Sequence, residues 1–93
     1  MIEQEAGCLS VKVPMIMANA RDLLAAGCAA LVPGEQVIDC SAVTEADSSA
    51  IAVMLGWLRA AGETQSTVKF SHLPDTVRVL AELYGVTELL PLA

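Results

Sequence analysis

The spacing of apolar and polar positions changes several times along the chain, and each change marks a predicted element. Alternation over Leu9–Val13 predicts a half-buried strand, and residues 2–5 could pair with it as a short first strand. Apolar residues at helical spacing predict a helix from Ala18 to about Leu31. The apolar run that follows the Pro33-Gly34 turn predicts a second strand over Gln36–Cys40.

The second half of the chain repeats this alternation of helix and strand. We predict a helix from about Ser49 to Ala60, ending near Gly62, then a polar loop over 63–67 and a short strand at Val68–Phe70. Pro74 and Asp75 suit the first turn of a last helix, with Gly85 as its cap. Its predicted core stripe is Val77, Leu80, Ala81 and Tyr84. Strands that alternate with helices predict one α/β domain over residues 1–93, with parallel pairs in its sheet.

The helix predicted over 49–60 is apolar or small on nearly every side. One face is predicted to be core and carries Ile51, Met54, Leu55 and Leu58. The opposite face carries Ser49, Val53, Gly56, Trp57 and Ala60, with Ala52 beside them. A surface helix of a small domain is normally polar there. This second face is therefore either buried within the domain or meets a partner.

Several residues of this helix have both a structural and a functional interpretation. Ser48 could cap the helix by accepting a backbone N–H, or it could face a partner. Asp47 could instead be the cap, which would leave the Ser48 hydroxyl free. Trp57 could be a partner anchor or could pack against a neighbouring loop, and Gly56 could admit a partner helix or close packing inside the domain.

Composition and charge exclude several classes of function. The net charge of −6 and five scattered basic residues argue against a nucleic-acid surface. A single His, no pair of His ligands and no phosphate-cradling glycine loop argue against an enzyme, a metal site or a bound cofactor.

The cysteines and the hydropathy pattern indicate where the protein works. Three widely spaced cysteines fit free buried thiols better than disulfides. No apolar run approaches the ~20 residues of a membrane span, and the first residues lack the pattern of a signal peptide. We therefore expect a cytoplasmic protein without direct membrane insertion.

Two segments resemble the STAS domain family (sulfate transporter and anti-sigma factor antagonist). The first runs from Val37-Ile38-Asp39-Cys40-Ser41 into Asp47-Ser48-Ser49-Ala50-Ile51, and the second is Leu80-Ala81-Glu82-Leu83-Tyr84-Gly85-Val86. Ala50 stands where the family usually has Gly, and Pro14 stands near where a Gly is common. The resemblance implies a single STAS-like α/β domain, with a mixed sheet of about four strands and helices mainly on one face.

The family resemblance also implies a function. The chain looks most like the small STAS subunit of the Mla-type phospholipid ABC transporter of Gram-negative bacteria, which would bind an ATPase subunit and, through it, a membrane permease. The alternative is an anti-sigma factor antagonist that binds a serine kinase and is phosphorylated at Ser48. A small-ligand sensor is a third class, though nothing in the sequence marks a pocket.

The resemblance places the partner surface at the start of the Asp-Ser-Ser helix. The candidate residues for partner binding or phosphorylation are Asp47, Ser48, Ser49, Ala52, Val53, Gly56 and Trp57. If Val53, Gly56 and Trp57 are exposed, the isolated chain should be adhesive and could self-associate. The protein would then be peripheral to the inner membrane through its partner.

Overall fold

Four strands form one mixed sheet in the order β1-β2-β3-β4. The computed structural model describes residues 1–93 and places these strands at Ile2–Glu5, Cys8–Val11, Gly34–Asp39 and Ser66–Ser71. The β1 and β2 strands are antiparallel, whereas β2, β3 and β4 are parallel. The expected first strand is therefore real, and the sheet contains the parallel pairs that the alternation of elements predicted.

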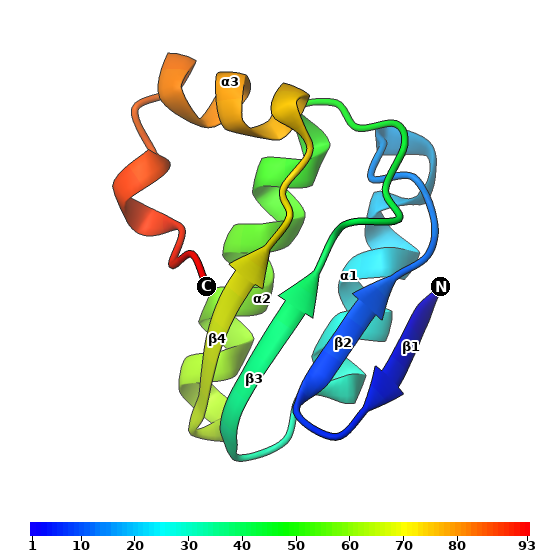
Figure 1. Ribbon diagram of the computed structural model, residues 1–93, viewed down its shortest axis with the longest axis vertical. Helices are drawn as coiled ribbons and strands as arrows, with labels where there is room; N and C mark the ends of the chain where they lie inside the picture. Colours follow the sequence, from blue (N-terminus) through cyan, green and yellow to red (C-terminus); the bar gives the residue numbers. More distant parts are fainter.

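Two of the three α-helices cover a single face of this sheet. Helices α1 (Ala20–Ala30) and α2 (Ser49–Thr64) lie side by side behind it, and α3 (Asp75–Leu83) lies beyond the carboxyl ends of β3 and β4 (Figure 1). Two 3-10 turns, η1 (Met17–Asn19) and η2 (Thr87–Leu89), complete the chain. The predicted fold class, with helices mainly on one face, is confirmed. None of the helices is long and apolar enough to cross a membrane.

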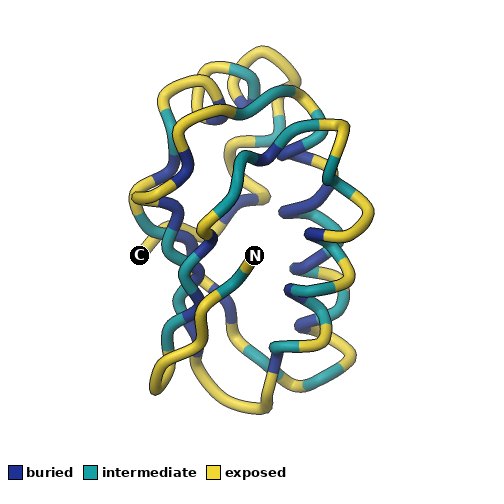
Figure 2. The backbone as a smooth tube through the Cα atoms, turned by 90° about the vertical axis from the view of Figure 1, so that its right-hand side faces the viewer, coloured by how far each residue is buried: buried dark blue, intermediate teal, exposed yellow.

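The core lies between the sheet and the helices. Figure 2 shows buried positions along the inner side of the helical layer and exposed positions along its outer side. The strands contribute alternate residues to this core, as a sheet with one covered face requires. These residues are Leu9, Val11, Ile38, Val68 and Phe70. The other face of the sheet is left open.

Helix α2 is longer than its sequence pattern indicated. It runs on to Thr64 instead of ending near Gly62, and Gln65 closes it in the left-handed conformation, with φ of 60°. Since β4 begins at Ser66, the polar loop expected over 63–67 is reduced to Gln65. Gly62, in the last turn of α2, is tolerated as a helical residue.

The face of α2 that was predicted to meet a partner is buried. Val53 is 3% exposed and Trp57 is 0% exposed. The Trp57 indole N–H donates to the Leu24 carbonyl of α1 at 3.1 Å. Gly27 of α1 makes room for the ring, since a Cβ added there would lie 2.1 Å from the indole nitrogen. The expected exposure of Val53 and Trp57 is therefore wrong, and the α1–α2 contact is the reason.

Two further predictions about the core need correction. On α3, Val77 and Ala81 are buried, but Tyr84 is 53% exposed because the helix ends there and Gly85, at φ 70°, turns the chain away. All three cysteines are free, but only Cys40 is fully buried. Burial raises the pKa of the Cys40 thiol to about 12, so this thiol stays protonated at neutral pH.

Candidate partner-binding surface at the start of α2

The Asp47 side chain fixes the first turn of α2. One carboxylate oxygen accepts the backbone N–H of Ser49 at 2.8 Å and also the Ser49 hydroxyl. The other oxygen accepts the backbone N–H of Met17 at 3.0 Å. The hydrogen bond from the Ser49 hydroxyl, followed by those from Met17 and Ser49 N–H groups, lowers the pKa of Asp47. Asp47 is thus the capping side chain, as one of the two alternatives proposed.

The Ser48 hydroxyl consequently plays no part in capping the helix. Its backbone is already helical, with φ −61° and ψ −22°, and its side chain makes no capping hydrogen bond. The residue is exposed at the very start of the helix. The interpretation of Ser48 as the helix cap is therefore wrong, and its hydroxyl is available to a partner or to a kinase.

A neighbouring segment adds a large apolar side chain that the sequence analysis did not select. Met15 and Ala46 form a short parallel bridge, with Met15 N–H donating to Glu45 and Asp47 N–H donating to Met15. Two residues after Met15, Met17 is 74% exposed next to the Asp47 carboxylate. The Met15-Ile16-Met17 run after Pro14 was the only sequence signal, and it does not indicate a contact with Asp47.

The exposed stripe of α2 is narrower than predicted. Ser48 and Ala52 are exposed and Ser49 is half-buried, whereas Gly56 is half-buried against α1. A Cβ added at Gly56 would lie 2.7 Å from a methyl carbon of Leu24, so packing inside the domain accounts for this glycine. The candidate surface, called the α2 head below, consists of Met17, Asp47, Ser48, Ser49 and Ala52.

A second polar cluster holds the loop that leads into α2. Asp39, at the end of β3, accepts hydrogen bonds from the hydroxyls of Ser41 at 2.5 Å and Ser71 at 2.8 Å. The His72 ring nitrogen Nδ1 lies 2.8 Å from the same carboxylate. The hydrogen bond from Ser41, with those of His72 and Ser71, lowers the pKa of Asp39 to about 2. The cluster ties the end of β3 to the end of β4 and to Ser41, in the loop that leads to α2.

We expect the Asp39 cluster to make stability depend on pH in the acid range. The folded-state pKa of Asp39 lies below its ordinary value of 3.8. Its contribution is therefore complete above about pH 4 and is lost as the pH falls towards about 2. Asp39→Asn should lower the free energy of unfolding at pH 7 by about 1–3 kcal/mol. Urea unfolding of the wild type and of Asp39→Asn at pH 7 and at pH 2 tests this. The difference between their free energies of unfolding should shrink at pH 2. An equal difference in the free energy of unfolding at pH 7 and at pH 2 would contradict this expectation.

Removing the Asp47 carboxylate should loosen the α2 head. Asp47→Ala leaves the N–H groups of Ser49 and Met17 without their acceptor. The loss of a capping side chain destabilises the first turn of the helix and should lower the melting temperature. Thermal unfolding should show this loss for Asp47→Ala, whereas Ser48→Ala should be close to wild type. The reverse order of the two variants would show that Ser48 caps the helix.

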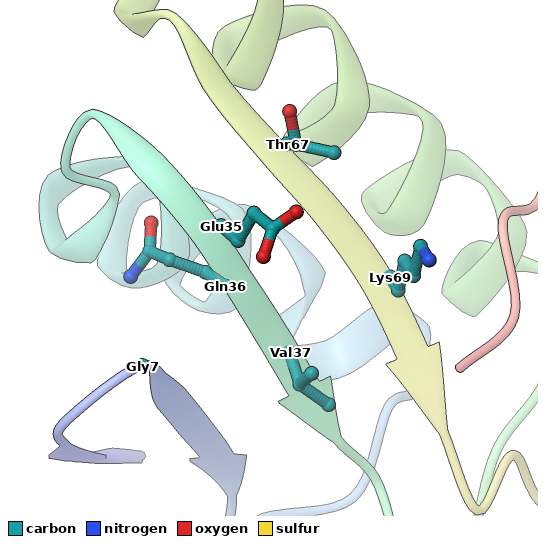
Figure 3. A pocket seen from close by; sticks show the side chains of 6 residues that line it. All are labelled: Gly7, Glu35, Gln36, Val37, Thr67 and Lys69. Carbon is teal, nitrogen blue, oxygen red and sulfur yellow. The ribbon is translucent and has the colours of Figure 1, made fainter.

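The open face of the sheet carries a shallow hollow of about 340 Å³ (Figure 3). Glu35 and Val37 of β3 and Thr67 and Lys69 of β4 line it, with Gly7 at its edge. Glu35 and Lys69 belong to the face that the helices do not cover, so the hollow is separate from the α2 head. No group of three or more His, Cys, Asp or Glu side chains is placed to hold a metal ion.

Two solved structures share this fold at low sequence identity. One is a Thermotoga maritima protein provisionally assigned as an anti-sigma factor antagonist, with a TM-score of 0.69 and 12% identity over 99% of this chain and 83% of the other. The other is an anti-sigma-factor antagonist (STAS) domain protein from Planctomyces limnophilus, with a TM-score of 0.73 and 17% identity over 98% and 86%. At such identities the likeness shows the fold alone.

Comparison with models of protein families, unlike the structural likeness, identifies a family for this chain. The model described as "Mlab, STAS domain" matches residues 2–91. Among curated proteins, none matches significantly. Because the matching family model spans nearly the whole chain, this protein belongs to the STAS domain family.

Proposed function

We propose that this protein is a non-enzymatic subunit that binds and regulates the ATPase of an ABC transporter moving phospholipid between membranes. STAS domains mediate protein–protein interactions. The α2 head would be the contact surface. The protein would then work in the cytoplasm, held at the inner membrane through the ATPase and its permease.

One observation carries the proposal: the Ser48 hydroxyl is free, and the hydrogen bonds of Asp47 hold the backbone around it in place. Asp47 bonds to two backbone N–H groups and so fixes both α2 and the η1 segment. The exposed Met17 offers an apolar anchor beside Ser48, and Ala52 keeps the next turn of the helix small. A preorganised surface with one apolar anchor loses little entropy on binding.

The description of the matching family model is one support for the transporter role. The model is described as "Mlab, STAS domain" and covers residues 2–91. In the family that this chain resembles, the Mla-type subunit partners an ABC ATPase.

A second candidate function is that of an anti-sigma factor antagonist switched by phosphorylation at Ser48. The exposed, unbonded hydroxyl suits both functions, and the names of both structural relatives favour this second one. A phosphate on Ser48 would meet the positive end of the α2 dipole but also the carboxylates of Asp47 and Glu45. Such a change would alter the charge of the α2 head at the point where a partner must displace water.

Affinity purification of the tagged chain from its native cells distinguishes the two functions. Recovery of an ABC transporter ATPase with its permease supports the transporter role. Recovery of a serine kinase, together with a phosphate on Ser48 detected by mass spectrometry, supports the alternative and overturns the first proposal.

A further inference from the structure

The outer face of α3 exposes large apolar side chains although the helix already buries its other face. Val77 and Ala81 pack into the core. On the opposite side Val79 is 62% exposed and Leu83, one turn later, is 73% exposed. Tyr84, at the end of the helix, is 53% exposed. An apolar group of this kind on a single helix is a common basis for binding another helix.

Unpaired carboxylates border this apolar group. Asp75 and Arg78 form an ion pair with each other, so they contribute no net charge. Glu82 and Glu88 have no ion-pair partner, and they line one hollow at the carboxyl end of α3. The carboxyl end of a helix carries partial negative charge of its own. The apolar group is therefore followed by a surface that favours a cation.

We propose that the outer face of α3, made of Val79, Leu83 and Tyr84 and bordered by Glu82 and Glu88, docks a basic amphipathic helix of a protein partner. Apolar side chains of the partner would cover Val79 and Leu83. A Lys or Arg one turn away would enter the hollow between Glu82 and Glu88. This surface lies on a different element from the α2 head, and the inference does not rest on the proposed transporter role.

The charges argue against the other occupants of this face. A second copy of the chain carries the same net charge of −6, which opposes its approach to an already acidic surface. An anionic lipid surface meets the same repulsion. A basic helix gains from both the apolar side chains and the carboxylates.

A synthetic peptide with leucine on one helical face and lysine on the other serves as the probe. Titrated into the isotope-labelled full chain, it should shift the backbone NMR signals of α3 and residues 84–89, and leave those of the α2 head in place. A peptide with glutamate instead of lysine should not bind. Equal binding of the two peptides, or shifts centred on the α2 head, would overturn the proposal.

Variants separate the two parts of the surface. Leu83→Ser and Val79→Ser should each weaken binding of the lysine peptide about tenfold or more, because anchor side chains dominate such contacts. Glu82→Gln should weaken it about two- to fivefold, as loss of an exposed charge pair does. Glu63→Gln, at an exposed carboxylate on the last turn of α2, is the matched control and should bind like wild type.

Three further outcomes would count against the inference. Leu83→Ser and Val79→Ser variants that melt like wild type and keep full affinity for the lysine peptide would overturn it. So would sedimentation showing a dimer of the wild type that Leu83→Ser dissociates, since a second copy would then be the occupant. Binding of the wild type to phosphatidylcholine vesicles, lost in Leu83→Ser, would identify a lipid surface instead.

Discussion

Replacing Trp57 with alanine is expected to lower the free energy of unfolding by about 3–5 kcal/mol. The ring is completely buried, and its N–H donates to the Leu24 carbonyl. The variant therefore loses a large apolar contact and one partly buried hydrogen bond between α1 and α2. Urea unfolding, followed by circular dichroism because the only Trp is removed, measures the loss.

Two further variants show that the contact with α1 is responsible. Gly27→Ala should destabilise in the same direction, because its Cβ would collide with the indole ring. Ala52→Ser, on the exposed side of the same helix, should stay within about 0.5 kcal/mol of wild type. A Trp57→Ala protein as stable as wild type would contradict the buried position of the ring and revive its role as a partner anchor.

Ser48→Glu is expected to weaken binding of the ATPase partner at least tenfold while leaving the domain folded. The new carboxylate would stand beside Asp47 on a surface that must lose water on docking. An unpaired charge that is desolvated costs several kcal/mol, and each 1.4 kcal/mol is about tenfold in affinity. Isothermal titration of the purified ATPase with wild type, Ser48→Ala and Ser48→Glu measures the effect.

The control for this prediction is a carboxylate placed elsewhere. Thr67→Glu adds the same charge on the open face of the sheet, where Thr67 is exposed. It should bind the ATPase like wild type, and Ser48→Ala should bind within a few-fold of wild type. If Ser48→Glu and Thr67→Glu weaken binding equally, the effect is one of net charge and the α2 head is not the contact surface.

The order of the elements could be predicted from the sequence because it depends on local signals. Alternation at Leu9–Val13, the Pro33-Gly34 turn and the Asp75 start of the last helix each act over a few residues. The orientation of α2 could not be predicted in this way. Almost every side of that helix is apolar, so its pattern does not single out the face that meets α1. Gly27, far away in sequence, creates the space that buries Trp57.

The candidate site shows the same division between local and distant contacts. The Asp47-Ser48-Ser49 motif, through its resemblance to the STAS family, pointed to the start of this helix as the candidate surface. The exposed Met17 depends on a bridge between segments that are far apart in the sequence. The contact of His72 with Asp39 likewise depends on the pairing of β3 and β4. Neither contact has a sequence signal of its own.

Capture of native partners by tagged wild type, Ser48→Glu and Thr67→Glu chains, each expressed at the same level in the native cells, tests the central claim most directly. Quantitative mass spectrometry would compare the ABC transporter ATPase recovered with each. The ATPase should be recovered with wild type and Thr67→Glu and be strongly depleted with Ser48→Glu. Recovery of the ATPase in equal amounts with all three, or of a serine kinase in its place, would contradict the account.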